Sequence, residues 1–158
     1  MKELIKEFKS KKKEFQEKMQ TEFKKSVAEY FKKYPIVEGI VWSQYTPYFN
    51  DGDECVFRVG DPNLVLKEEA YEAFPEDQKE FFYQEDYHFK KLDLDNKGLV
   101  GISISYRAKD SEFIKDTNEV FSLWNSDIDD IFKAMFDDHV CVYLKNNGEV
   151  VVQDIDHD

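Results

Sequence analysis

The chain has 158 residues, of which 41% are apolar and 16% aromatic, and its formal net charge is −12. This is the length of one ordinary domain, and the apolar share is sufficient for a core, which excludes a wholly disordered chain. No apolar run approaches the roughly 20 residues of a membrane-spanning helix, and the N-terminus lacks the apolar stretch of a secretory signal, so we expect a cytoplasmic protein without membrane association.

The charge is unevenly distributed along the chain. Residues 1–34 contain 11 lysines and 6 acidic residues, whereas residues 35–158 contain 11 basic and 28 acidic residues. A body with this excess of carboxylates repels nucleic-acid phosphates and attracts basic surfaces. We therefore expect a basic protein partner and regard direct nucleic-acid binding as disfavoured.

Residues 3–34 predict one long amphipathic helix. Large apolar residues recur every three or four positions, and no glycine or proline interrupts them before Pro35. The lysines at 9, 11, 12 and 13 surround the sparsest part of this stripe, so we expect the first third of the helix to project beyond the core. An uncovered stripe favours a homodimer through this helix. The stripe comprises Leu4, Phe8, Phe15, Met19, Phe23, Val27, Tyr30, Phe31 and Tyr34.

The body begins with a predicted β-hairpin over residues 36–60. Its arms are residues 36–45 and 54–59, and Asp51-Gly52 between them is a strong turn signal. A short strand is predicted at residues 64–66. Residues 68–91 are predicted to be mostly helical, in two pieces separated at Phe74-Pro75.

The second half of the body predicts a half-buried strand over residues 98–106, one or two helices over residues 111–136, and a hairpin over residues 139–155. This order indicates an α+β fold in which helices pack on an antiparallel sheet of four to five strands. The chain contains no internal repeat and no linker. We therefore predict a single domain over residues 1–158, with a basic N-terminal helix (1–34) and an acidic α+β body (35–158).

The richest candidate for a binding site is the segment of residues 42–55, where aromatic rings lie beside amides and carboxylates on a predicted loop. Rings offer rigid contact area at low entropic cost, and the polar groups can orient a ligand. The alternative is a plain hairpin whose aromatic residues pack into the core. The candidate binding residues are Gln44, Tyr45, Tyr48, Asn50, Asp51 and Asp53.

The same segment resembles a family of small proteins from tailed phages and some bacteria. The shared string is W-x-Q-Y-T-P-Y-F-N-D-G-D-x-C-x-F, from Trp42 to Phe57, about a tenth of the chain. The resemblance implies a phage or bacterial cytosolic setting, and it brings no activity with it.

No catalytic, metal or cofactor site is predicted. The segment 93–98 begins like a calcium-binding EF-hand loop, but Lys97 and Ile104 stand where oxygen ligands are required. The three histidines lack metal-ligand spacing, and the chain has neither a serine nucleophile elbow nor a glycine-rich phosphate loop. Cys55 and Cys141 both fall in predicted strands, where a free, buried thiol is the expected state.

The function that these observations favour is a non-enzymatic, acidic interaction protein that binds a basic protein surface as an adaptor or inhibitor, with nucleic-acid mimicry as one mode of binding. A rival interpretation is a small enzyme or ligand-binding module. It requires Tyr45, Tyr48 and Asp51 or Asp53 to converge around one pocket. An acidic immunity or antitoxin protein is a third alternative, which would also bind its partner through the negative charge of the body.

Overall fold

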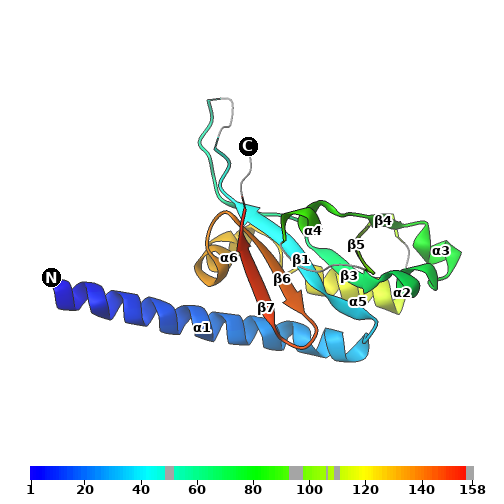
Figure 1. Ribbon diagram of the computed structural model, residues 1–158, viewed down its shortest axis with the longest axis horizontal. Coiled ribbons are helices and arrows are strands. Elements are labelled where there is room, and N and C mark those ends of the chain that lie inside the picture. Colours follow the sequence, from blue (N-terminus) through cyan, green and yellow to red (C-terminus); the bar gives the residue numbers. More distant parts are fainter. Residues whose placement is uncertain (49–51, 93–97, 106, 109–110, 156–158) are drawn as a thin grey trace.

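The computed structural model describes residues 1–48, 52–92, 98–105, 107–108 and 111–155. It shows the predicted α+β fold, with a long N-terminal helix that runs along one side of an antiparallel sheet (Figure 1). The helices are α1 (Lys2–Lys33), α2 (Glu68–Glu72), α3 (Glu76–Lys79), α4 (Tyr87–Lys91), α5 (Glu112–Phe121) and α6 (Asp129–Phe136), and a 3-10 turn covers Ser126–Ile128.

The described strands form one sheet in the order β4-β5-β3-β1-β6-β7, and β2 pairs with the end of β1. Every pairing is antiparallel. The sheet has seven strands, more than the four to five predicted, because β2 and β4 are too short to leave a periodic pattern. The strands are β1 (Val37–Tyr45), β2 (Arg58–Val59), β3 (Asn63–Lys67), β4 (Phe82–Gln84), β5 (Leu99–Ile104), β6 (Val140–Lys145) and β7 (Val150–Asp154).

The prediction of a mostly helical segment in two pieces over residues 68–91 is wrong at β4. The acidic residues and Pro75 produce two short helices, α2 and α3, but Phe82 then becomes a buried edge-strand residue opposite Ile104. Phe82 packs edge-on against Phe74, with ring centroids 5.2 Å apart. Burial of this one ring fixes the strand, since a three-residue segment has little intrinsic preference of its own.

The predicted hairpin over residues 36–60 is also only partly correct. Just two residues of β1 pair with β2, while most of β1 pairs with β3 on one edge and β6 on the other. Cys55 precedes β2 and lies outside any strand, contrary to the prediction, whereas Cys141 is buried in β6. Long-range pairing with β6 outweighs the local turn because it buries β1 in the centre of the sheet.

One face of the sheet is covered by α1, α5 and α6 and holds the main core. An aromatic cluster at its centre joins these layers, with Phe23 of α1 lying edge-on to Trp42 of β1 at 6.1 Å and to Phe132 of α6 at 5.3 Å. Such edge-to-face pairs add to the free energy gained from burial. The cluster comprises Phe23, Trp42, Trp124, Phe132 and Phe136.

The N-terminal half of α1 projects away from this core (Figure 1). The buried residues of the helix begin only at Phe23, whereas Leu4, Phe8 and Phe15 are 63%, 68% and 52% exposed. The exposed residues continue the stripe that the sequence predicts. The projecting first third is therefore confirmed.

The opposite face of the sheet is covered less completely. Val41, Val65 and Tyr143 form a smaller core there, closed by Leu92 and by Ile155, which follows β7. The helix α4 covers one part of this face, and the described part of the chain leaves a cavity beside it.

Candidate functional site

Gln44, one of the predicted binding residues, is a core residue. Its side chain is fully buried; its amide nitrogen donates to the backbone carbonyls of Phe132 (3.0 Å) and Asp137 (2.7 Å), and its amide oxygen accepts from the indole nitrogen of Trp42 (3.0 Å). These bonds join β1 to the middle and to the C-terminal end of α6. The amide is thus engaged within the protein.

The loop that follows β1 is anchored to the turn before β6. The Asp138 carboxylate accepts hydrogen bonds from the Thr46 amide (2.8 Å), the Thr46 hydroxyl (2.6 Å) and the His139 amide (2.8 Å). Burial alone would raise the pKa of this carboxyl, but the hydrogen bonds outweigh it and lower the pKa. Tyr48 is 65% exposed and stacks on His139, with ring centroids 5.0 Å apart.

The described loop residues Tyr48 and Asp53 do not line the cavity that Tyr45 lines. Asp53 is exposed, and neither Asp53 nor Tyr48 is among the described residues that line the cavity beside Tyr45. Asn50 and Asp51 lie outside the described residues, as does most of the EF-hand-like segment, residues 93–97. The described loop residues therefore give no support to the predicted pocket of the rival interpretation.

Tyr45 instead lines a cavity of about 800 Å³ on the less covered face of the sheet. We call this the sheet-face cavity. Its floor consists of small polar side chains from adjacent strands, namely Ser43 of β1, Asn63 of β3 and Ser103 of β5. Tyr45, Tyr83, Tyr87 and Arg107 stand around it, with Asp61 and Glu85.

At the floor of this cavity, the partner strand along one edge of β1 changes from β2 to β3. The Gly60 amide donates to the Ser43 carbonyl at 2.8 Å, and a Cβ atom at position 60 would lie 2.8 Å from that same oxygen. Only glycine permits this close approach. The chain can therefore leave β2 and enter β3 along the same edge of β1, so that Gly60, Asp61 and Asn63 border the cavity.

A buried histidine forms one wall of the sheet-face cavity. The His88 Nδ1 lies 2.8 Å from the Ser43 hydroxyl, and the imidazole also hydrogen-bonds to the Asp61 backbone. Burial, with the positive charge of Lys91, lowers the pKa of His88 from 6.5 to about 4. The ring is therefore neutral at pH 7, and it is a weak base for activating the Ser43 hydroxyl.

The nearby Cys141 is no better as a nucleophile. Its Sγ lies 3.7 Å from the His88 carbonyl oxygen, to which the thiol donates, and burial raises the pKa of the thiol to about 11. The thiol is protonated at neutral pH and hence unreactive. Among the described residues, no three His, Cys, Asp or Glu side chains are grouped so as to hold a metal ion.

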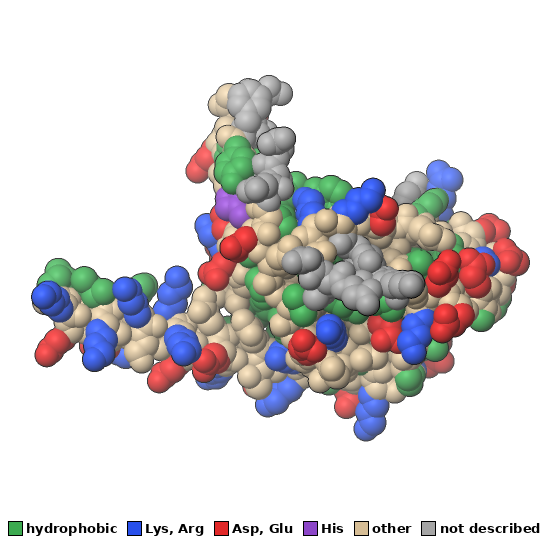
Figure 2. Space-filling view, viewed as in Figure 1, with side chains coloured by type: hydrophobic (Ala, Val, Ile, Leu, Met, Phe, Trp, Pro, Cys, Tyr) green, Lys and Arg blue, Asp and Glu red, His purple; other side chains and the backbone are tan. Residues whose placement is uncertain are grey.

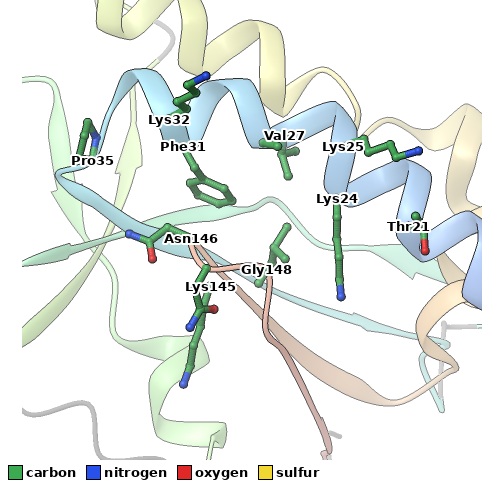
Figure 3. Close-up of a pocket in the computed structure, with 13 residues that line it drawn as sticks. Thr21, Lys24, Lys25, Val27, Phe31, Lys32, Pro35, Lys145, Asn146 and Gly148 are labelled. Atoms are coloured by element: carbon green, nitrogen blue, oxygen red, sulfur yellow. The ribbon is translucent and has the colours of Figure 1, made fainter.

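A second concavity, of about 500 Å³, lies between α1 and the turn of the β6–β7 hairpin (Figure 3). Val27 and Phe31 point into it, and Lys24 extends across it from α1, whereas Lys25 and Lys32 point away. Lys145 on the far side is paired with Glu149 at 3.2 Å. The positive side chains do not converge on one point, so this groove has no well-defined anion site.

Carboxylates gather at the end of the molecule that carries α2 and α3 (Figure 2). Residues 68–86 contain eight acidic residues and one lysine, and all eight acidic residues are exposed. We call this surface the acidic end. It comprises Glu68, Glu69, Glu72, Glu76, Asp77, Glu80, Glu85 and Asp86.

The small polar residues of one strand were a sequence signal for the sheet-face cavity, but their alternation with apolar residues did not distinguish a cavity from open solvent. In the predicted strand over residues 98–106, the apolar residues alternate with Gly101, Ser103 and Ser105, a pattern expected of a solvent-facing side. In the fold, that side faces the cavity, because β4 and α4 border it. His88 offered no spacing signal, since its partners Ser43 and Asp61 are distant in sequence.

A comparison of the chain with models of protein families, with curated proteins and with solved structures finds no match. Within the described part of the chain, no helix combines the length and the apolar character that crossing a lipid bilayer requires.

Proposed function

We propose that the protein is a non-enzymatic, cytosolic interaction protein whose acidic end binds a basic surface of another protein, as an adaptor or inhibitor. The observation on which this proposal depends is the gathering of eight exposed carboxylates at one end of the molecule, opposite the projecting basic helix. A patch of one charge sign produces a potential that steers and orients an oppositely charged partner.

The carboxylates of the acidic end are only partly neutralised by neighbouring bases. Lys79 pairs with Glu72 and Glu76 at 3.3 Å, and Lys90 pairs with Asp86 at 3.2 Å. The remaining five carboxylates have no ion pair among the described residues. Their charge is available to a partner, and a row of carboxylates can compete with phosphates for a nucleic-acid-binding groove.

A capture experiment with matched variants tests this proposal. The acidic-end variant combines Glu68→Gln, Glu69→Gln, Asp77→Asn and Glu80→Gln. Its control combines Glu3→Gln, Glu14→Gln, Glu17→Gln and Glu29→Gln, which changes the net charge equally but on α1. We expect the wild type and the control to retain a basic protein from a lysate of the source cells at low salt, and the acidic-end variant to lose at least about tenfold in affinity.

Two outcomes of that experiment contradict the proposal. If the wild type retains no basic protein at low salt, the proposed partner does not exist. If the acidic-end variant retains the partner as well as the wild type does, the acidic end is not the binding surface. Displacement of the captured protein by added DNA identifies a nucleic-acid-binding partner and supports mimicry.

We also propose that the exposed stripe of α1 forms a homodimer. Leu4, Phe8 and Phe15 leave a strip of large apolar side chains in water, which a second copy of the helix can cover. Light scattering should then give the mass of a dimer for the wild type and for Ser10→Glu, which changes the opposite side of the helix, and the mass of a monomer for Phe8→Glu. A monomeric wild type at concentrations of about 0.1 mM excludes the dimer.

A further inference from the structure

We propose that the sheet-face cavity binds a small, neutral, hydroxyl-rich ligand of the size of a mono- or disaccharide. The inference does not depend on the proposed protein partner, because the cavity is formed mainly by residues from β1, β3, β4, β5 and α4, with only Glu85 shared with the acidic end. Its volume of about 800 Å³ lies within the range of small-molecule sites.

The strongest reason is an amide on the cavity floor that has no hydrogen-bond partner within the described part of the chain and is open to a ligand. Asn63 is only 5% exposed and lines the cavity, and the described part of the chain supplies no hydrogen bond to its carboxamide. Among the described residues, Trp124 Nε1 is the only fully buried side-chain nitrogen or oxygen without a hydrogen-bond partner, so the polar atoms of the Asn63 amide are open to the cavity and reach its solvent. A ligand that presents a donor and an acceptor side by side, as vicinal hydroxyls do, satisfies both atoms of the amide.

The rest of the cavity floor is formed by small polar side chains and not by apolar ones. Ser43 and Ser103 lie on strands flanking β3, on the face that carries Asn63, and their small side chains leave the volume above them open. The Ser103 hydroxyl likewise makes no hydrogen bond to the described residues. A floor of hydroxyl and amide groups favours a ligand with many hydroxyls over an apolar one.

Tyrosine rings form the rim of the cavity. Tyr83 and Tyr87 are 56% and 49% exposed, and Tyr45 of β1 lines the cavity with them. Lys91 fixes the Tyr87 ring from one side: its Nζ donates to the Tyr87 hydroxyl at 2.6 Å. Rigid aromatic faces suit the apolar C–H face of a sugar ring, while the hydroxyls of the sugar meet the polar floor.

The charges around the cavity favour a neutral ligand. Asp61, Glu85 and Arg107 line it, and the Lys91 Nζ lies 4.0 Å from the Tyr87 ring centroid and 6.0 Å from that of Tyr45. Two negative and two positive side chains leave no net local charge, and the net charge of −12 disfavours phosphorylated ligands. The carboxylates remain suitable acceptors for sugar hydroxyls.

Titration of the full chain with a panel of neutral mono- and disaccharides, followed by NMR, tests the proposal. We expect at least one sugar to bind with a Kd below about 10 mM. Asn63→Leu should weaken that binding at least about tenfold and leave the unliganded protein as stable as the wild type, because no hydrogen bond within the chain is lost. Tyr48→Ala, which changes an exposed ring outside the cavity, should bind as the wild type does.

If Asn63→Leu fails to fold, Tyr83→Ala provides the same test, since its ring is exposed on an edge strand, and we expect a similar loss of binding. The proposal is overturned if no sugar of the panel binds at about 50 mM, if both cavity variants bind as the wild type does, or if nucleosides or inorganic phosphate bind more tightly than every sugar. Loss of sugar binding with intact capture of a basic protein separates this inference from the proposed function.

Discussion

Gln44 shows how a residue that resembles a binding group in sequence can serve the core instead. Its amide satisfies the Trp42 indole nitrogen and two carbonyls around α6, and one of these belongs to Asp137, whose φ of 74° is unusual for a residue other than glycine. Replacement by leucine would leave all three groups buried without these partners. The amide therefore fixes the turn that leads from α6 into β6.

We expect Gln44→Leu to lower the free energy of unfolding by about 3 kcal/mol, because buried polar groups lose their hydrogen bonds. Urea unfolding monitored by tryptophan fluorescence measures the change. Asp53→Asn, an exposed loop substitution, is the control and should stay within about 0.5 kcal/mol of the wild type. A Gln44→Leu protein as stable as the wild type would show that the amide does not support the turn.

His88 makes the stability of the chain depend on pH. Its pKa is lowered from 6.5 to about 4 by burial and by Lys91, with only the Asp61 backbone acting in the opposite direction. Between these two pH values the unfolded chain binds a proton that the folded chain does not. Stability from this residue is therefore complete above pH 6.5, declines as the pH falls toward about 4, and changes no further below it.

We expect the wild type to lose on the order of 3 kcal/mol through this residue over that interval, and His88→Asn to show a correspondingly weaker pH dependence. Urea unfolding at a series of pH values measures both proteins. Parallel curves for the two proteins would contradict the assignment of this dependence to His88.

At the scale of secondary-structure elements, α1 performs two different roles along its length. Its C-terminal half contributes Phe23 to the aromatic cluster, while Phe8 in its N-terminal half is 68% exposed. The same type of side chain thus occupies opposite environments in one continuous helix.

We expect Phe23→Ala to destabilise the protein by about 4 kcal/mol, because it opens a cavity among the rings of Trp42, Trp124 and Phe132. Phe8→Ala should change the stability of the monomer by less than about 0.5 kcal/mol. Thermal unfolding at low protein concentration compares the two. A large loss for Phe8→Ala in a monomeric sample would show that the projecting half of α1 contacts the body.

The elements that could be predicted from the sequence are those with a sustained period. The apolar spacing of α1 and the alternation around Asn146-Asn147-Gly148 identified the long helix and the β6–β7 hairpin. The strand β4 could not be predicted, because three residues carry no period and Phe82 is fixed by tertiary packing with Phe74.

The candidate site was less predictable than the fold for a physical reason. The floor of the sheet-face cavity is assembled from residues on three strands, and an alternating strand looks the same whether its polar side meets bulk water or a cavity. The aromatic residues around Tyr45 in the sequence made it a candidate. Asn63 and His88 could not be selected in this way, because the residues that surround them in the fold come from distant parts of the sequence.

At the scale of the whole molecule, the net charge of −12 opposes folding through self-repulsion. Glu80 and Glu119 are exposed, and neither has an ion pair among the described residues. Glu80 directly follows α3, and Glu119 lies in the last turn of α5, where the helix dipole favours positive charge. Replacement of both by lysine would change the net charge to −8 and would place positive charge at both helix ends.

We therefore expect Glu80→Lys/Glu119→Lys to raise the free energy of unfolding by about 1 kcal/mol at low ionic strength, and Glu80→Gln/Glu119→Gln to raise it by about half as much. Both gains should nearly vanish at about 0.5 M NaCl, because salt screens interactions between exposed charges. Urea unfolding at low ionic strength and at the high salt concentration measures the free energy of unfolding of each double variant relative to the wild type. A gain that persists at high salt would point to local packing as its origin, and a loss of stability at low salt would mean that these two carboxylates have partners that offset the repulsion of the acidic body.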